Sequence, residues 1–306
     1  MAGFGEHSVG DLSGRRVVVT GANSGIGLET SRILLSHGAD VVMACRDETK
    51  GGAALRLVGS TRGRGEVARL DLADRSSIRS FADGLEGVTD LVNNAGIMAC
   101  PLAFTADGLE LQMATNHFGH ALLTALLLPK LAPGGRVVFV SSIAARGGKL
   151  DSTTTAEDLT SPSPYSAQRV YSNTKQANLL FAQELERRLR AAKRATVSLA
   201  AHPGVSATEL FPRQLRDSNR AYLVPLLRPI MSFLLQPASA GALPSVRALV
   251  DPAVQGGELI GPRWLGQTRG APEFLPVYRS ARDETAARHL FELTESILGL
   301  EIVGAA

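Results

Sequence analysis

A tyrosine and a lysine four residues apart, Tyr171 and Lys175, are well suited to proton transfer. Residues spaced by four share one face of an α-helix, so the ammonium group can lie beside the phenol. A free tyrosine has a pKa near ~10, and a nearby cation favours the phenolate. We therefore expect a general acid/base pair, although the same spacing is also typical of a packed tyrosine followed by an exposed lysine.

A second tyrosine, Tyr165, repeats this spacing with Arg169 in the lysine position. An arginine side chain stays protonated and cannot relay a proton. Pro162 and Pro164 disfavour helical backbone before Tyr165, which places it in a loop. We therefore assign the proton-transfer role to Tyr171 and treat Tyr165 as a pocket-lining candidate.

A glycine-rich turn, residues 20–27, follows the first apolar β-branched run of the chain. Its glycines allow a tight turn that opens into a helix near Gly25. Unpaired N–H groups and the positive dipole at such a helix start attract a diphosphate. An ordinary strand-to-helix turn is the alternative, but the position after a first strand favours dinucleotide binding. The expected contacts are Gly21, Asn23, Ser24, Gly25, Ile26 and Gly27.

Further motifs follow this turn, whose spacing is Gly-x-x-x-Gly-x-Gly. In order they are Asp71-Leu72, Asn93-Asn94-Ala95-Gly96, Asn116, Ser141-Ser142 and Tyr171-Ser172-Asn173-Thr174-Lys175. With this set the chain resembles the short-chain dehydrogenase/reductase family, from about Leu12 to a C-terminal helix near Leu298. Cys45-Arg46-Asp47 and His202-Pro203-Gly204 are most similar to its retinol dehydrogenase-like branch. The resemblance implies a nicotinamide-dependent oxidoreductase.

The resemblance also implies catalytic roles. Hydride transfer to a carbonyl leaves negative charge on oxygen, which needs a proton donor and a group that holds the oxygen. Ser142 would hold the substrate oxygen beside Tyr171, and Asn116 would hold a helix bend and a water relay that reaches Lys175. Ser141 competes with Ser142, because neighbouring strand residues point to opposite faces. Without the other motifs, Ser142 would be a strand-end hydroxyl and Asn116 a helix-terminal amide.

By the same resemblance, the cofactor extends along several strand ends. Asp71 and Leu72 would flank the adenine. Asn93, Ala95 and Gly96 would line the cofactor cleft, and Pro203, Gly204, Val205 and Thr208 would meet the nicotinamide side. Taken alone, Asn93-Asn94 is also typical of a strand-ending turn and Pro203-Gly204 of a loop. The joint pattern favours the cofactor assignment.

Cofactor choice is expected to depend on the end of the second strand, which reads Ala44-Cys45-Arg46. An acidic residue there accepts hydrogen bonds from a ribose diol and repels a phosphate. The family pattern places that acid at Cys45, whereas the guanidinium of Arg46 can bind a 2′-phosphate. We expect NADP(H); the alternative is that Arg46 pairs with Asp47 or Glu48 on the surface.

Short apolar runs are expected to form the strands that position these motifs, as in a parallel sheet buried on both faces. They lie at 16–20, 39–44, 88–92, 136–141 and 195–200. Segments with helical spacing alternate with them at 26–37, 76–85, 109–131 and 168–189. This alternation predicts an α/β, Rossmann-type, doubly wound sheet. We expect a single domain over 14–306 after a tail, 1–13, with substrate-loop insertions near 147–169 and 206–236.

The second insertion is rich in leucine, valine, isoleucine and phenylalanine, which favours a lipophilic ketone, aldehyde or alcohol as substrate. Retinoid-like, steroid-like and polycyclic substrates all fit. Its stretch 222–235 is interrupted by two prolines and an arginine and is too short to span a bilayer. We expect a helix pair that covers the pocket rather than a membrane-surface anchor. Members of the family commonly form oligomers through helices such as 109–131 and 168–189, so the sequence is compatible with a homo-oligomer and does not decide the oligomeric state.

Composition predicts an ordinary globular protein. The net charge of +3 is spread thinly, which argues against nucleic acid as a partner. Cys45 and Cys100 are far apart, so we expect neither a disulfide nor a zinc site, and a reducing, cytoplasmic setting fits. The N-terminus lacks a secretory signal. His117 and His120 suit packing or a helix surface better than a metal site, because no third ligand stands near them in the sequence.

Two other functions share parts of this sequence pattern. One is a catalytically silent NADP(H)-binding regulatory protein, against which the intact set Asn116, Ser142, Tyr171 and Lys175 argues. The other is an epimerase or dehydratase of the same superfamily, whose glycine spacing differs and whose sugar-nucleotide domain needs a longer C-terminal part.

Overall fold

The computed structural model describes residues 3–205 and 236–303. Thr208, the apolar stretch at 222–235 and nearly all of the predicted insertion at 206–236 lie outside the described residues.

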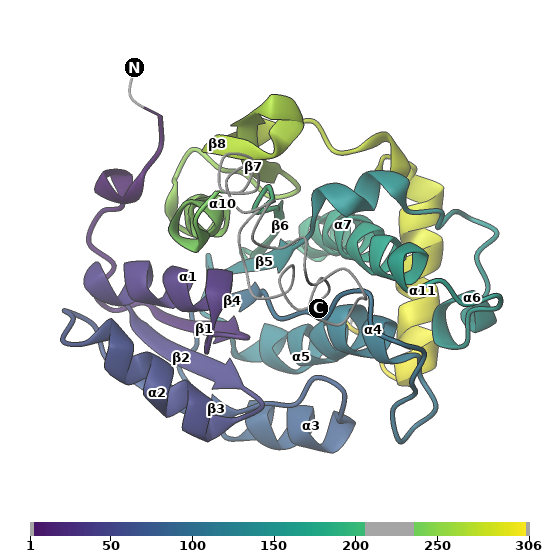
Figure 1. Cartoon of the computed structure of the whole chain (residues 1–306), viewed down its shortest axis with the longest axis horizontal. Helices are drawn as coiled ribbons and strands as arrows, with labels where there is room; N and C mark the ends of the chain where they lie inside the picture. The colour runs from purple at the N-terminus through teal and green to yellow at the C-terminus, as the bar shows by residue number, and fades with distance from the viewer. Residues whose placement is uncertain (1–2, 206–235, 304–306) are drawn as a thin grey trace, which may run out of the picture.

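Eight strands form one sheet whose neighbouring pairs are all parallel except the last, β7–β8 (Figure 1). In sheet order they are β3 (Gly65–Arg69), β2 (Asp40–Cys45), β1 (Arg16–Thr20), β4 (Asp90–Asn93), β5 (Arg136–Val140), β6 (Val197–Ala201), β7 (Leu259–Trp264) and β8 (Arg269–Leu275). The strand order reverses between β1 and β4, and a crevice forms where the connections diverge beyond the carboxyl ends of such strands. The expected Rossmann-type fold is confirmed.

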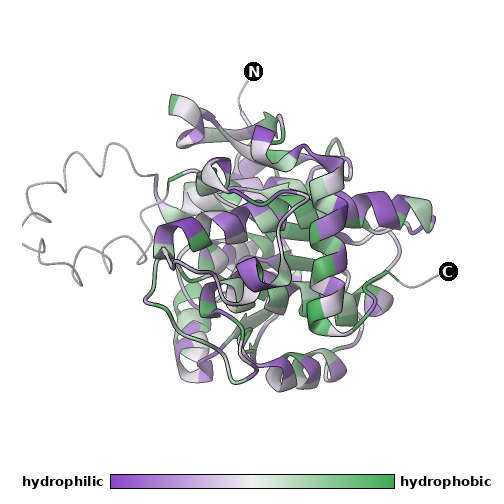
Figure 2. Ribbon diagram, turned by 90° about the vertical axis from the view of Figure 1, so that its right-hand side faces the viewer, coloured by the Kyte–Doolittle hydropathy of each residue, from purple (hydrophilic) through white to green (hydrophobic). Residues whose placement is uncertain are grey.

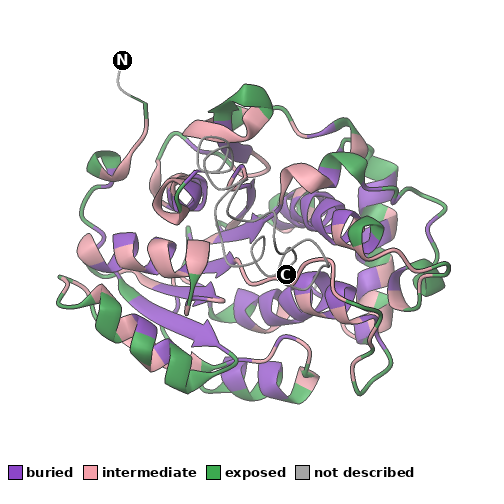
Figure 3. Cartoon of the chain, viewed as in Figure 1, coloured by how far each residue is buried: buried purple, intermediate pink, exposed green. Residues whose placement is uncertain are grey.

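Helices cover both faces of this sheet. One face is packed by α1 (Gly25–Ser36), α2 (Glu48–Val58) and α10 (Ala238–Val250), the other by α3 (Arg75–Asp83), α5 (Gly119–Leu127) and α7 (Ala167–Ala191). Along β1 the buried side chains alternate between the two faces. Val17 and Val19 pack on the face that α1 covers, and Val18 packs on the face that α7 covers. The central strands and most of α7 are accordingly buried, whereas α2 exposes its outer face (Figure 3).

Apolar residues are concentrated in the layers between the sheet and the helices. In Figure 2 green, hydrophobic residues predominate there, and purple, hydrophilic residues lie on the outer faces of the helices. This distribution is what burial on both faces of a parallel sheet requires. The expected continuous apolar strands are confirmed at β1, β2, β4, β5 and β6.

Three strands fall outside the expected set, namely β3, β7 and β8. β3 is a half-buried edge strand and lacks the continuous apolar run that marks the central ones. β7 and β8 form an antiparallel hairpin that contains Pro262 and Pro272 opposite each other. Proline cannot donate to a ladder and is confined to sheet edges, so neither segment has the sequence signal of a central strand.

The segment expected to be an N-terminal tail packs against the domain instead. Val9 and Leu12 are buried in the core around α1, and Glu6 forms an ion pair with Arg32 of α1 at 2.9 Å. Phe4 also packs against this core. The otherwise polar composition of residues 1–13 hides these few apolar anchors.

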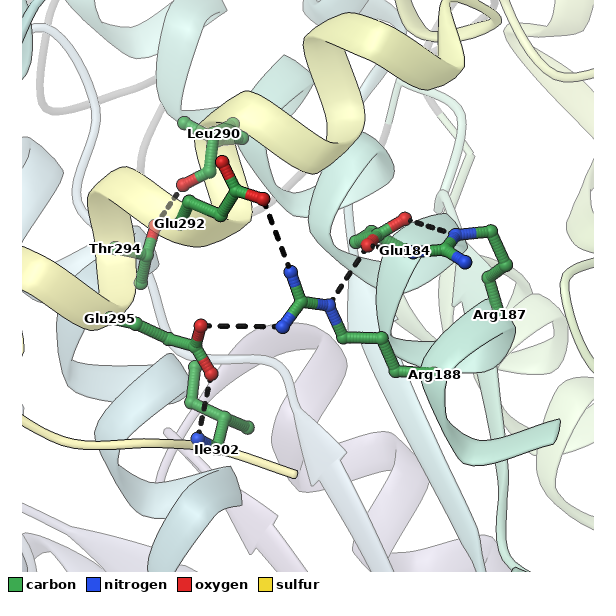
Figure 4. A network of polar contacts seen from close by, with 8 residues as sticks. All are labelled: Glu184, Arg187, Arg188, Leu290, Glu292, Thr294, Glu295 and Ile302. Carbon is green, nitrogen blue, oxygen red and sulfur yellow. Dashed lines mark hydrogen bonds and ion pairs between the residues drawn. The ribbon is translucent and has the colours of Figure 1, made fainter. Parts of the chain in front are cut away.

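The long helix α7 is clamped by the C-terminal helix α11 (Glu284–Leu298). Arg188 of α7 binds Glu184 at 2.9 Å and Glu295 of α11 at 3.3 Å (Figure 4). Its guanidinium also lies 4.2 Å from the centre of the Phe291 ring. Glu295 also accepts a hydrogen bond from the backbone N–H of Ile302 at 2.9 Å. This network fixes the far half of the helix whose first half carries the predicted catalytic pair.

The helix expected over 109–131 is interrupted. A short α4 (Leu111–Met113) leads into a π-helical turn, Ala114–Phe118, before α5 begins, and the N–H of Gly119 bonds to the carbonyl of Ala114 five residues back. π-Helical turns are rare and occur often at functional sites. Asn116 is at the centre of this one.

Candidate active site

One cleft of about 740 Å³ opens at the carboxyl ends of the strands. It is lined by 17 residues predicted from the sequence, namely Gly21, Asn23, Ser24, Gly25, Ile26, Gly27, Arg46, Asp71, Leu72, Ala95, Gly96, Ser142, Tyr171, Lys175, Pro203, Gly204 and Val205. The fold thus brings together residues that are up to 184 positions apart in the chain, from Gly21 to Val205.

The N-terminus of α1 is open to this cleft. The helix begins at Gly25, as expected, and the side chain of its N-cap, Ser24, makes no capping hydrogen bond to the described residues. By contrast, Asp47 caps α2 and Ser166 caps α7 through their side chains. The uncapped N–H groups and the helix dipole suit a diphosphate, so this end fits a dinucleotide cofactor.

Glycine is required in the turn because the backbone approaches other segments closely. A Cβ atom at Gly27 would lie 2.4 Å from the carbonyl oxygen of Gly21 and 2.5 Å from the amide nitrogen of Asn94. Gly21 has a positive φ of 65° and would bring a Cβ within 3.0 Å of Ala95. The turn and the loop after β4 therefore pack together as one wall of the cleft.

Arg46 lies at the other end of the cleft, just beyond β2. Among the described residues Arg46 forms no ion pair with Asp47 or Glu48. Asp47 instead caps α2, and its carboxylate lies 3.5 Å from Nζ of Lys50. Cys45, at the position of the NAD-selecting acid, is buried and its thiol donates to the carbonyl of Asp47 at 3.3 Å. The guanidinium is thus available to an anionic group in the cleft.

Tyr171 and Lys175 lie on one face of α7, as their spacing predicts. The Nζ atom of Lys175 is 5.9 Å from the centre of the Tyr171 ring and donates to the carbonyl of Val140 at 3.0 Å. Burial lowers the pKa of Lys175 to about 8. Burial raises the pKa of Tyr171, and a hydrogen bond with Ser142 opposes the rise. The downward direction expected for Tyr171 is therefore reversed here, because enclosure of the hydroxyl outweighs that hydrogen bond.

The structure distinguishes the two adjacent serines. The hydroxyl of Ser141 donates to the backbone carbonyl of Lys175 at 2.7 Å and is committed to holding α7. Ser142 lines the cleft, accepts from the N–H of Ala144 at 3.2 Å and forms a hydrogen bond with the Tyr171 hydroxyl. The geometry favours Ser142 for the substrate oxygen.

Asn116 lies immediately behind the cleft, fully buried. Its side chain exchanges two hydrogen bonds of 2.8 Å with the backbone of Ile97 and donates to Thr174 at 3.1 Å. A Cβ atom at Gly96 would be 3.3 Å from the Asn116 oxygen and 3.5 Å from Nζ of Lys175, so both side chains lie close to Gly96. The π-helical turn supplies the helix bend that the resemblance implies.

Asn93 does not line the cleft. It is fully buried, and its amide donates to the hydroxyl of Thr124 in α5 at 2.9 Å. The next residue, Asn94, lines the cleft in its place and donates to the carbonyl of Thr20 at 2.8 Å. The error has a simple cause: successive side chains at a strand end point to opposite sides, and the dipeptide does not reveal which one faces the ligand.

Comparison with known proteins agrees with this geometry. The family model of short chain dehydrogenases matches residues 15–153. Human retinol dehydrogenase 11 is 38% identical over 300 residues, which cover 95% of this chain and 88% of that protein. Human retinol dehydrogenase 12 is 38% identical and covers 94% of this chain and 88% of its own length. This chain belongs to the short-chain dehydrogenase family.

A solved structure extends the likeness to the whole fold. The crystal structure of an uncharacterised protein from Mycobacterium paratuberculosis is 41% identical, with a TM-score of 0.82, and the match covers 98% of this chain and 99% of that one. The retinol dehydrogenase-like resemblance is confirmed. Short-chain dehydrogenases are oxidoreductases that use a nicotinamide cofactor. No helix within 3–205 and 236–303 is long and apolar enough to cross a membrane.

From outside the cleft of this short-chain dehydrogenase, Tyr165 supports a loop. It precedes α7 in a loop, as expected, but it does not line the cleft. Its hydroxyl donates to the carbonyl of Cys100 at 2.8 Å and accepts from Gln112 at 2.9 Å. Burial raises the pKa of Tyr165 to about 12. Tyr165 therefore holds the loop that carries Cys100 rather than facing a ligand.

The two histidines have roles that their spacing did not reveal. His117 and His120 are both fully buried, so the helix-surface alternative is wrong. His117 contacts Asn178 at 3.3 Å and Thr294 at 3.0 Å, which ties the π-helical turn to α7 and α11. The described residues contain no cluster of three side chains that could hold a metal ion.

Proposed function

We propose that this short-chain dehydrogenase interconverts a lipophilic ketone or aldehyde and its alcohol with NADP(H), and that Tyr171 is the general acid/base. One observation carries the proposal: a single cleft joins Arg46, the open N-terminus of α1 and the Ser142–Tyr171–Lys175 group. A dinucleotide needs an anion site at one end and a reaction site at the other, and these features are in that order.

The preference for NADP(H) is supported by charge. Arg46 brings a cation to the cleft, and Cys45 stands where an acid would bind a ribose diol. A guanidinium binds a phosphate through charge-assisted hydrogen bonds, whereas it gains little from a neutral diol.

The bound nicotinamide would donate or accept the hydride, and the protein's own residues would manage the proton. In reduction, Ser142 donates a hydrogen bond to the substrate oxygen while the Tyr171 hydroxyl transfers its proton to that oxygen. Lys175 holds a positive charge behind the phenol and so stabilises the phenolate that forms. Asn116 lies close to Gly96, as the Lys175 ammonium does, and helps to hold this part of the site in position. In alcohol oxidation each proton moves in the reverse direction.

A lipophilic substrate is supported by the lining of the cleft and by the relatives. Apolar side chains of Met98, Leu111 and Ile143 line the same cleft as Tyr171. The two human relatives are named as dehydrogenases of retinol, which is a lipophilic alcohol. An apolar wall with a few polar groups orients such a molecule by its one oxygen.

The direct test is a screen of lipophilic ketones and aldehydes that follows NADPH consumption, with the reverse reaction of the alcohols and NADP⁺ in parallel. We expect turnover with at least one class and none with the Tyr171→Phe variant. Tight NADPH binding without turnover of any substrate would contradict the proposal and favour the regulatory alternative. Retinoid, steroid and polycyclic carbonyls should be compared in the same screen, because the apolar lining accommodates all three.

A further inference from the structure

His120 bridges two parts of the site that are far apart in the sequence. It follows the π-helical turn as the second residue of α5 and is completely buried. Its Nδ1 atom lies 3.1 Å from the backbone oxygen of Asn116, and its Nε2 atom lies 2.9 Å from the hydroxyl oxygen of Thr20 at the end of β1. The ring therefore spans the distance between the Asn116 turn and the glycine-rich turn.

The two partners determine the tautomer of the ring. A backbone carbonyl can only accept, so Nδ1 must carry the hydrogen that it gives to Asn116. Burial lowers the pKa of His120 to about 3, so the ring is neutral at ordinary pH. Nε2 is then an acceptor, and the hydroxyl of Thr20 must donate to it.

The direction of the Thr20 hydroxyl matters for the cleft wall. Its oxygen also accepts the backbone N–H groups of Asn94 and Ala95, both at 2.9 Å. The carbonyl of Val92 is a second possible acceptor for its proton, but at 3.4 Å it is farther than His120. With its proton given to His120, Thr20 can accept both N–H groups and hold the loop after β4 against the glycine turn.

We propose that His120 is a positioning residue that couples the cofactor cradle to the Asn116 turn. Through Nε2 it orients the hydroxyl that joins the glycine turn to the Asn94–Ala95 loop, and both segments line the cleft. Through Nδ1 it holds the carbonyl of Asn116, whose side chain lies close to Gly96, as the Lys175 ammonium does. One ring thus influences cofactor affinity and proton transfer. The kinetic half of this inference rests on the proposed function, and the affinity half does not.

Two substitutions separate the two contacts. In His120→Asn the amide nitrogen is as many bonds from the backbone as Nδ1, so it can donate to Asn116 but does not reach Thr20. In His120→Gln the amide oxygen is as many bonds away as Nε2, so it can accept from Thr20 but leaves the Asn116 carbonyl without its donor. We expect His120→Asn to raise the Kd for NADPH roughly tenfold with kcat nearly unchanged. His120→Gln should lower kcat roughly tenfold with the Kd nearly unchanged, since one buried hydrogen bond is lost in each case.

His117→Gln is the matched control, because His117 is equally buried on the same segment but binds α7 and α11. It should lower the thermal midpoint without separating kcat from Kd. If both His120 variants change kcat and Kd in equal proportion, or follow stability as the control does, His120 only fills space and the proposal is wrong.

A second variant protects the test against misfolding. Thr20→Val removes the same hydroxyl from the opposite side and must reproduce the rise in Kd seen with His120→Asn; an unchanged Kd would refute the affinity half. If the wild-type protein shows no turnover at all, the proposed function fails, but the Kd values of these variants still decide whether His120 supports the cofactor cradle. NADPH is the probe in each titration, with NADH as the comparison.

Discussion

The ammonium of Lys175 lies 5.9 Å from the centre of the Tyr171 ring and donates to the carbonyl of Val140 at 3.0 Å. The lysine is thus anchored to the end of β5 while its charge faces the phenol from one side. Ser142, which follows β5 closely, reaches the same phenol through a hydrogen bond. Strand β5 and helix α7 together therefore hold the three groups that the proposed proton transfer needs.

The first prediction concerns the phenol. Tyr171→Phe should reduce kcat by at least about a thousandfold, because general acid catalysis contributes 10²–10⁴-fold and the substrate oxygen also loses a hydrogen bond. NADPH affinity should stay nearly intact. Substantial residual activity in this variant, measured by NADPH consumption, would contradict the mechanism.

Tyr165→Phe is the matched control for that variant. It removes the hydrogen bonds to Cys100 and Gln112 but leaves the cleft lining intact. We expect a loss of stability of about 1–3 kcal/mol with most of kcat retained. If Tyr165→Phe abolished turnover as completely as Tyr171→Phe, the choice between the two tyrosines would be wrong.

The second prediction concerns the charge on Lys175 and the stability of the fold. Burial lowers the pKa of Lys175 from 10.5 to about 8, so the folded protein binds fewer protons than the unfolded chain between these values. The free energy of unfolding of the wild type should then rise as the pH increases from about 8 to 10.5. Below pH 8 Lys175 is protonated in both states, so the full free-energy cost of burying its charge is present. Lys175→Met should be more stable than wild type at pH 7 by up to about 3 kcal/mol, although inactive.

Chemical denaturation at pH 7 and at pH 10 measures this difference. The advantage of Lys175→Met should shrink at the higher pH, where the wild-type lysine is neutral in the folded state. Lys149→Met, at an exposed position, serves as the control and should alter stability little at either pH. A Lys175→Met advantage that stays constant with pH would show that charge burial is not its cause.

The third prediction concerns Arg46. Loss of a charge-assisted contact to a phosphate costs about 1.5–3 kcal/mol, so Arg46→Ala should weaken NADPH binding roughly 10- to 100-fold while NADH changes much less. Fluorescence titration with both cofactors gives the ratio directly. Equal losses of affinity for the two cofactors would refute the role of Arg46 in binding the 2′-phosphate and favour a surface ion pair with Asp47 or Glu48 instead.

The fourth prediction concerns the glycine turn. Gly27→Ala places a Cβ 2.4 Å from the Gly21 carbonyl oxygen, a backbone atom that cannot move cheaply. We expect NADPH binding to weaken at least tenfold, together with a loss of stability of about 1–3 kcal/mol from overpacking. Gly52→Ala in α2 is the control, since its nearest neighbour is the flexible Arg56 side chain at 3.5 Å, and alanine is a better helix former. Its Kd for NADPH should not change.

Much of the fold was predictable because it depends on local signals. Strands β1, β2, β4, β5 and β6 are continuous apolar runs, and the start of α1 at Gly25 follows from the spacing of the glycines. Strand β3 and the β7–β8 hairpin were missed, because a half-buried edge and two prolines carry little local signal for a strand. The N-terminal segment was missed for a similar reason, since its few apolar anchors give no local signal and are buried only because α1 packs against them.

The sequence by itself determined the family and the side chains available for the chemistry. These are a tyrosine, a lysine, two serines, a glycine-rich turn, and Arg46 beside Cys45, where the family pattern places an acid. Residue type and spacing along one chain are enough for that, since a helix or strand turns spacing into direction. Orientation and environment were decided only by the tertiary structure. It committed the Ser141 hydroxyl to the backbone carbonyl of Lys175 and paired Ser142 with Tyr171, placed Asn94 rather than Asn93 on the cleft, and joined His120 to Thr20 across 100 residues. Hydrogen-bond partners and burial arise between distant segments, and burial also sets the pKa values of Tyr171 and Lys175.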